Sequence, residues 1–436
     1  MASESIQERK QSGSQDARSL PSAAMHVPAP APIGTPPLAV LGGPPRFSAP
    51  KYVGTPTLPD RATLHTRLDE MLDAKRLTND GPFVQEFEAR LSRMNDGVEV
   101  VAVCNATVGL QLLVKALGLR GEVILPSFTF VATAHACTWE GLTPVFVDID
   151  KDSHTIDPLR VAEAVTMDTA AIIGVHLWGR MCRMRELEAI ARDRGVPLLF
   201  DAAHALGCTY ADRPMGAYGT ASVVSFHATK FIQSLEGGAI FTPDRNLAAR
   251  LRLLRNFGFA GYDNVVALGT NAKLDEFSAA MGLGSLEGLE ALVETNRRNR
   301  LAYRQALAAL PGLSLYEYDE REENNFQYLI VEVTPEACPF TRDELVQVLH
   351  AENVIARRYF HPGCHRSAPY RDAARKQPWR LPVTERICDT LIALPTGAGV
   401  TIHDIAAIGG ILHTAMGASV AVRGALAGHP GLRVAA

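Results

Sequence analysis

Seven short apolar runs, separated by segments of helical periodicity, constrain the fold of this chain more than any other feature. The runs cover residues 99–103, 122–125, 144–148, 171–175, 197–200, 222–225 and 239–242. Apolar runs that alternate with helical patterns are typical of a buried parallel sheet with helices on both faces. The sequence therefore predicts an α/β fold with a mostly parallel, seven-stranded sheet.

The regions outside these runs complete the predicted domain organisation. Residues 1–36 are rich in Ser, Pro and Ala, a composition that buries too little apolar surface to fold, so we expect a disordered tail there. The sheet and its helices predict a large domain over residues 37–300. A smaller α+β domain is expected over residues 301–418, and residues 419–436 are expected to form a flexible tail.

Composition narrows the class of protein. The chain has 436 residues, 47% of them hydrophobic, and its 43 basic and 47 acidic residues give a net charge of −4. No basic run could follow a phosphate backbone, so no nucleic-acid partner is expected. The seven cysteines include no CxxC pair, which favours a reducing cytoplasm and argues against a disulfide framework or a zinc ribbon.

One apolar stretch near the C-terminus is long enough to raise the question of a membrane span. It covers residues 405–420, but His413, Ser419 and several glycines interrupt it. Thr401 and Asp404 have the three-residue spacing of a helix capping box directly before it. We therefore expect a packed helix here and no association with a membrane.

Two polar residues emerge where predicted strands end. Asp201 follows one apolar run directly, and Lys230 ends the motif Ser225–Lys230 that follows another. Strand ends of this kind form the usual ligand-binding edge of an open α/β sheet. A lysine amine can bond to the aldehyde of pyridoxal phosphate, and an acid can hold the ring nitrogen protonated. The pair therefore indicates a pyridoxal phosphate site, with a solvated lysine and a helix-capping aspartate as the alternatives.

A third group of residues is suited to the cofactor's phosphate. Asn105, Ala106 and Thr107 lie between an apolar run and the helical pattern 110–117. Backbone N–H groups at a helix N-terminus bind phosphate, so Ala106 and Thr107 are candidate phosphate ligands, with the Ser225 hydroxyl beside them. The alternative is a plain helix cap by Asn105 or Thr107.

Several motifs occur in one order along residues 38–415: Cys104–Thr107, Pro126–Thr133, Pro144–Asp150, the Asp201 and Lys230 motifs, and Asn271–Glu276. In this series the chain resembles the DegT/DnrJ/StrS family of sugar aminotransferases, which are fold-type-I pyridoxal phosphate enzymes. Two further segments, Val175–Arg180 and Gly269–Lys273, are similar to those of the C4 aminotransferases of desosamine biosynthesis. That similarity implies a nucleotide-linked 4-keto-6-deoxyhexose as substrate.

The resemblance assigns a role to each site residue. Lys230 would bond to the cofactor and act as the general base, and Asp201 would tune the ring. His204 would lie near the cofactor's phenolic oxygen, although a packed core histidine is the alternative. Phe130 would stack on the ring, whereas its sequence context alone indicates only a core position. Asn271 would reach the phosphate of the neighbouring subunit, which makes the active unit a homodimer with composite active sites.

Other residues depart from the family pattern or invite a different interpretation. Lys273 stands where many relatives have arginine, and Asn324–Gln327 replaces a histidine-containing motif, so the nucleotide and amino-donor contacts do not carry over directly. His361, Cys364 and His365 resemble a metal cluster, but they lack an evident fourth ligand. We therefore expect no metal.

The predicted reaction is transfer of an amino group, from L-glutamate, to the keto carbon of a nucleotide-linked sugar. The preferred product is dTDP-4-amino-4,6-dideoxyglucose. Amination at C3, or of a keto-cyclitol, remains an alternative, because motifs for the cofactor do not specify which ketone is presented. The family's C3 dehydratase activity, in which histidine replaces the lysine, is disfavoured by Lys230. A non-catalytic, pyridoxal-phosphate-binding regulator is the alternative from another functional class.

Overall fold

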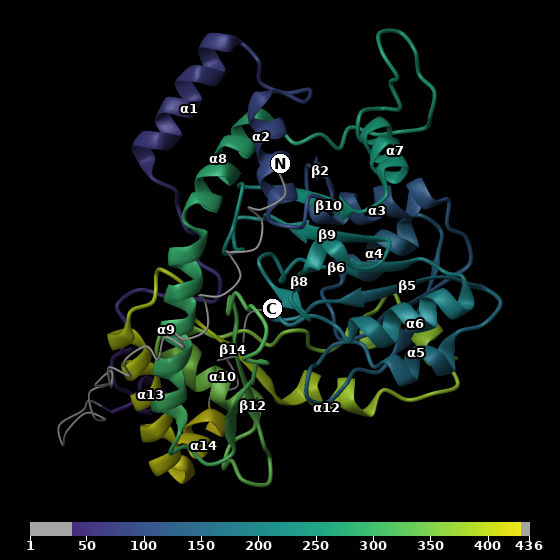
Figure 1. Cartoon of the computed structure of the whole chain (residues 1–436). Coiled ribbons are helices and arrows are strands. Elements are labelled where there is room, and N and C mark those ends of the chain that lie inside the picture. The colour runs from purple at the N-terminus through teal and green to yellow at the C-terminus, as the bar shows by residue number, and fades with distance from the viewer. Residues whose placement is uncertain (1–36, 429–436) are drawn as a thin grey trace, which may run out of the picture.

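A seven-stranded sheet forms the centre of the larger part of the molecule (Figure 1). The computed structural model describes residues 37–428, so the predicted tail at 1–36 lies outside the described residues. The strand order is β2-β10-β9-β6-β5-β3-β4. Strand β10 is antiparallel to both of its neighbours, β2 and β9, and the remaining pairs of this sheet are parallel. The strands are β2 (Glu99–Val103), β3 (Glu122–Pro126), β4 (Thr143–Val147), β5 (Thr169–Val175), β6 (Leu198–Asp201), β9 (Ala221–Ser225) and β10 (Gly238–Thr242).

Helices cover both faces of this sheet, as the alternating pattern predicts. One face packs against α2 (Pro82–Arg93), α5 (Pro158–Ala164), α6 (Met184–Arg194) and α8 (Glu276–Glu287). The other face packs against α3 (Ala106–Leu117), α4 (Ala132–Trp139) and α7 (Arg245–Arg255). Helix α1 (Arg61–Ala74) lies against α8. With both faces covered, the strands are almost wholly apolar, and polar side chains concentrate at their ends.

Helix α6 shows how local sequence sets the crossover connections. Leu187 and Ala191 are buried on one side, while most of the charged side chains of the helix lie towards solvent. The helix ends because Gly195 adopts a φ of +65°, and its N–H donates to the carbonyl of Ala191. A left-handed residue of this kind closes a helix at little cost when it has no side chain.

A second, smaller unit is built on a three-stranded antiparallel sheet in the order β11-β12-β14. Its strands are β11 (Leu313–Leu315), β12 (Leu329–Val333) and β14 (Leu391–Leu394), and its helices include α9 (Leu289–Leu307), α10 (Arg342–Ala351), α12 (Pro382–Thr390), α13 (Ile402–Gly417) and α14 (Ser419–Gly428). The predicted boundary between residues 300 and 301 falls inside α9. The predicted tail at 419–436 begins with α14, whose Val422 and Leu426 are buried against this unit.

The N-terminal segment also differs from the predicted division of the chain. Residues 38–52 pack against the smaller unit, where Leu38 and Phe47 join its core. The buried carboxylate of Glu352 accepts hydrogen bonds from the backbone N–H groups of Ala39, at 2.7 Å, and Arg46, at 2.6 Å. Strand β1 (Lys51–Tyr52) then pairs with β13 (Val354–Ile355).

Helix α13 begins at the predicted capping box. The Thr401 hydroxyl accepts from the Asp404 N–H at 3.1 Å, and the Asp404 carboxylate accepts from the Thr401 N–H at 2.9 Å. In the described part of the chain no single helix is long and apolar enough to cross a membrane. Helices α13 and α14 meet that test only as a pair, and they are bent by 91° at their junction.

Replacing Thr401 by alanine should destabilise the smaller unit, because the N–H of Asp404 loses its capping acceptor. We expect a loss of about 1 kcal/mol in the free energy of unfolding. Urea unfolding monitored by circular dichroism measures it. Thr414→Ala is the control, because the Thr414 hydroxyl bonds only to the Gly410 carbonyl within the same helix. Equal losses in the two variants would contradict a specific role for the cap.

Candidate active site

Lys230 and Asp201 lie at the carboxyl edge of the large sheet, as the sequence predicts. Asp201 is the last residue of β6, and its register partner in the parallel strand β9 is Val223. Lys230 follows β9 in a turn in which its backbone N–H donates to the carbonyl of His227 at 2.8 Å. The two charged groups are close enough for each to influence the pKa of the other.

Asp201 is a buried carboxylate with donors on both oxygens. Its side chain is 7% exposed, and burial raises its pKa above the ordinary aspartate value. The Thr133 hydroxyl donates to Oδ2 at 2.7 Å and the Ala203 N–H donates to Oδ1 at 3.1 Å, and both bonds act against that rise. Thr133 itself bonds to the Thr129 hydroxyl at 2.9 Å. Asp201 is therefore held in one orientation by short-range donors.

Lys230 is held where its amine can lose a proton near neutral pH. Burial lowers the pKa of its ammonium to about 8, while the negative charge of Asp201 acts in the opposite direction. The amine donates to the hydroxyl of Tyr328 at 3.2 Å. Tyr328 directly precedes β12 in the smaller unit, whereas Lys230 follows β9 of the large sheet, so the two hydrogen-bond partners come from different units.

His204 is both a packed histidine and a neighbour of Lys230. Its ring stacks on Trp178, with centroids 5.7 Å apart, and lies 4.4 Å from the ring of Tyr328. Burial, and then the charge of Lys230, hold its pKa well below the usual value, so the ring is neutral. Because Nδ1 accepts from the backbone N–H of Trp178 at 3.4 Å, the proton is on Nε2. No hydrogen bond from the rest of residues 37–428 reaches Nε2, which can therefore donate to a ligand.

The segment Asn324–Gln327, which departs from the family's histidine motif, supports this histidine. The Gln327 side chain donates to the His204 carbonyl at 2.6 Å, and that of Asn325 donates to the same oxygen at 2.9 Å. Asn325 also donates to the Leu206 carbonyl at 3.1 Å. The segment Asn324–Gln327 therefore positions the loop that follows Asp201.

The N-terminus of α3 lies beside Ser225, as expected for a phosphate site. Asn105 caps the helix by accepting from the Val108 N–H at 2.9 Å, which leaves the N–H groups of Ala106 and Thr107 at the first turn. Gly238 pairs with Ser225, and a Cβ at that glycine would lie 2.7 Å from the Ala106 nitrogen. Sheet and helix end therefore approach closely here because position 238 has no side chain.

Phe130 and Asn271 are the exposed members of the predicted set. Phe130 is 59% exposed, and its carbonyl accepts from the N–H of Thr133, the residue that holds Asp201. Asn271 is also exposed, and it forms a bridge with Asn256 at the end of the long connection after α7. Both are accessible to a ligand or to a second chain.

Three residues of the site could not be identified from the sequence. Thr133, Trp178 and Tyr328 contact Asp201, His204 and Lys230, but no local pattern distinguishes them from ordinary core residues. Thr133 and Trp178 do lie in segments that carry the family resemblance, Pro126–Thr133 and Val175–Arg180, but the resemblance assigned neither a role. The ring of Trp178 is fully buried and stacks on Phe360, with centroids 5.4 Å apart.

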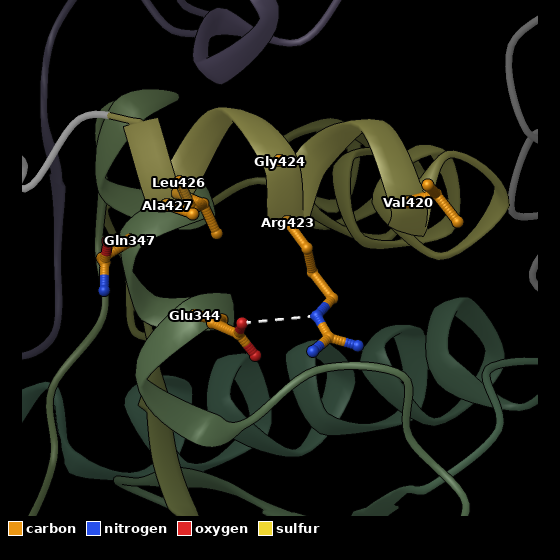
Figure 2. A pocket seen from close by; sticks show the side chains of 7 residues that line it. All are labelled: Glu344, Gln347, Val420, Arg423, Gly424, Leu426 and Ala427. Atoms are coloured by element: carbon orange, nitrogen blue, oxygen red, sulfur yellow. Dashed lines mark ion pairs between the residues drawn. The ribbon is translucent and has the colours of Figure 1, made fainter.

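Two other features are separate from this chemistry. Among residues 37–428, no three or more His, Cys, Asp or Glu side chains are grouped to hold a metal. His365 instead bonds to the Ser127 hydroxyl at 2.6 Å. A pocket of about 520 Å³ lies in the smaller unit between α10 and α14, where Arg423 pairs with Glu344 at 3.6 Å (Figure 2). None of the predicted site residues lines it.

Comparison with known proteins agrees with this geometry. Residues 60–413 match the DegT/DnrJ/EryC1/StrS aminotransferase family. A dTDP-4-amino-4,6-dideoxy-D-glucose transaminase of Escherichia coli is 33% identical over 346 residues, covering 79% of this chain and 92% of that protein. One of the same name from Shigella dysenteriae is 38% identical over 314 residues, covering 72% of this chain and 85% of that protein.

Solved structures give the same result. The crystal structure of DesI with its TDP-sugar product is 48% identical, has a TM-score of 0.84, and the match covers 90% of this chain and 98% of DesI. The predicted family and fold class are thereby confirmed: the chain belongs to the DegT/DnrJ/EryC1/StrS aminotransferase family.

Proposed function

We propose that this chain is a pyridoxal-phosphate-dependent aminotransferase that converts dTDP-4-dehydro-6-deoxy-D-glucose to dTDP-4-amino-4,6-dideoxy-D-glucose, with L-glutamate as the amino donor. The observation that carries the proposal is the pairing of a half-buried Lys230 with a buried Asp201, in which the lysine pKa is lowered to about 8. The product named for the relatives from Escherichia coli and Shigella dysenteriae supports the choice of sugar.

The residues of the site fit pyridoxal phosphate. Lys230 supplies an amine for the aldehyde, and Asp201 supplies a carboxylate for the ring nitrogen. The first turn of α3, at Ala106 and Thr107, supplies N–H donors for the phosphate, and Ser225 adds a hydroxyl. When bound, the cofactor supplies an aromatic ring that accepts electrons from the carbon next to the substrate's amine.

The chain's own groups supply positioning and proton transfer. A lysine whose pKa is near 8 is partly neutral at neutral pH, so the Lys230 amine can take up a proton from a substrate carbon and return it. His204, protonated at Nε2, is a donor that stays neutral because its pKa is low. The hydrogen bond from the Thr133 hydroxyl favours the charged form of Asp201, against the burial that raises its pKa. Burial of His204 and Asp201, and partial burial of Lys230, strengthens these interactions.

The alternatives are distinguished by simple measurements. C3 amination and keto-cyclitol amination would use the same lysine and acid, so a panel of 3-keto and 4-keto dTDP- and UDP-sugars is required to separate them. A non-catalytic regulator would bind the cofactor and leave its visible absorbance unchanged when glutamate is added. A loss of the visible band on adding glutamate alone supports the aminotransferase.

We further propose a homodimer with composite active sites. The connection between α7 and α8 extends away from the body of the subunit (Figure 1). It exposes six apolar side chains, Phe257, Phe259, Tyr262, Val265, Val266 and Leu268. Exposed apolar side chains gathered on one connection are typical of a protein interface, and the connection leads directly to Asn271. A second copy of the chain is the partner that would bury it.

The first test of this function concerns Lys230. Borohydride reduction of the wild-type enzyme should attach the cofactor to the peptide that contains Lys230, as identified by mass spectrometry. Lys230→Ala should lower transamination by at least about a thousandfold, because it removes both the bonding amine and the base. The variant should still bind the cofactor through the other contacts. Attachment at a different lysine would refute the assignment.

The second test concerns the hydroxyl that bonds to Asp201. Thr133→Val removes a donor that lowers the carboxyl pKa, so the pKa should rise further. The carboxylate then forms only at higher pH, and the acid limb of the pH profile of the glutamate half-reaction should move to higher pH. Thr129→Val should produce a smaller shift, because the Thr129 hydroxyl bonds to Thr133 and not to Asp201 itself. An unshifted profile in Thr133→Val would show that Asp201 does not titrate in the reaction.

The third test is complementation between two defective chains. Chains with Lys230→Ala are mixed with chains with Asn271→Ala, refolded together, and the heterodimer is isolated. In a dimer with shared sites, one of the two sites of each heterodimer combines an intact Lys230 with an intact Asn271. The isolated heterodimer should therefore have roughly half of the wild-type sites, and the unfractionated random mixture roughly a quarter. Heterodimer with no activity above the Asn271→Ala parent would place Asn271 outside a composite site.

A further inference from the structure

We propose that Tyr328 is a positioning residue, whose hydroxyl holds the free amine of Lys230 in the orientation from which it moves a proton. The inference rests on the proposed function, because it concerns the same amine. It adds a group that neither the sequence motifs nor the family match assigns. The hydroxyl of Tyr328 is the hydrogen-bond acceptor that the structure places next to the Lys230 amine, at 3.2 Å.

The ring of Tyr328 is fixed by aromatic neighbours. It lies 4.4 Å from the ring of His204 and 5.4 Å from that of Trp178, which it meets edge to face. Tyr359 contacts it edge to face as well, with centroids 5.9 Å apart. A tyrosine packed in this way loses little further freedom when it accepts a hydrogen bond. The flexible lysine side chain is therefore the partner that becomes ordered.

The backbone of Tyr328 is anchored to the wall of the site. Its carbonyl accepts from the Tyr318 hydroxyl at 3.2 Å, and the same hydroxyl donates to the Trp178 carbonyl at 2.7 Å. The Tyr318 hydroxyl thus links the backbone of Trp178, which follows β5 of the large sheet, to the backbone of Tyr328, which precedes β12. The position of the Lys230 amine consequently depends on how the smaller unit packs against the larger one.

The protonation states favour this role. Burial raises the pKa of Tyr328, so its phenol keeps its proton throughout the working range of the enzyme. It can accept from the ammonium of Lys230, and when the amine is neutral it can also donate to the amine's lone pair. The same contact thus serves the lysine before and after it takes up a proton.

The test compares Tyr328→Phe with a matched control, Tyr370→Phe. Tyr370 is a buried tyrosine whose hydroxyl bonds to His135 at 2.5 Å and which has no contact with Lys230. The first readout is the pH dependence of the reaction of Lys230 with acetic anhydride in the full chain freed of cofactor, followed by peptide mass spectrometry. It reports the lysine directly and does not depend on transamination.

Loss of the acceptor should destabilise the ammonium and lower the pKa of Lys230 below the value of about 8. Labelling at pH 7 should then be faster by about threefold to tenfold in Tyr328→Phe. In the enzyme loaded with cofactor, the glutamate half-reaction should slow about tenfold, with little change in the KM for glutamate. The kinetic isotope effect with 2-deuterated glutamate should increase, because proton transfer becomes slower. Tyr370→Phe should resemble the wild type in every readout.

The proposal is overturned if the labelling profile and the isotope effect of Tyr328→Phe match those of Tyr370→Phe. It is also overturned if the two variants slow the reaction equally, because the effect would then come from loss of any buried hydroxyl. The proposed function fails separately, if the wild-type chain shows the Lys230 profile described here yet does not aminate any keto sugar of the panel.

Discussion

Partial burial of the Lys230 amine is the constraint on which the chemistry of this protein depends. A lysine in water keeps its proton at neutral pH and is neither a base nor a nucleophile. Here burial lowers its pKa to about 8, and the nearby charge of Asp201 limits the fall. The sheet creates this environment, because β6 and β9 are parallel neighbours and both lead to the same edge. Asp201 and the loop that carries Lys230 therefore lie at the same edge of the sheet.

The residues that the sequence identified have positions tied to secondary structure. Asp201 ends a strand, Ala106 begins a helix, and Lys230 follows a strand by a short turn, so local patterns were sufficient to place them at one edge. The same holds for the seven strands, whose predicted bounds agree with the observed ones to within two residues. Patterns of apolar residues carry this information because each strand is buried on both faces.

The residues that the sequence did not identify depend on contacts between distant segments. Tyr328 reaches Lys230 only because the smaller sheet packs against the larger one, and nothing near residue 328 indicates this. Asn325 and Gln327 were recognised only as a departure from the family, and their bonds to the His204 carbonyl required the fold. Likewise, the prediction of a flexible tail from residue 419 was wrong for α14, because Val422 is buried only by its neighbours in the smaller unit.

The bonds between Glu352 and the N-terminal segment imply an order of events during synthesis. The smaller unit takes part of its core from Leu38 and Phe47, although most of its residues follow position 300. A ribosome therefore releases the first part of this unit long before the rest exists. Because domains fold as their chains emerge, the large sheet can form before the residues that bind the segment 38–52 have been synthesised. The N-terminal segment can dock only after α10 and β13 have left the ribosome. Its packing against the smaller unit is therefore a late step of folding.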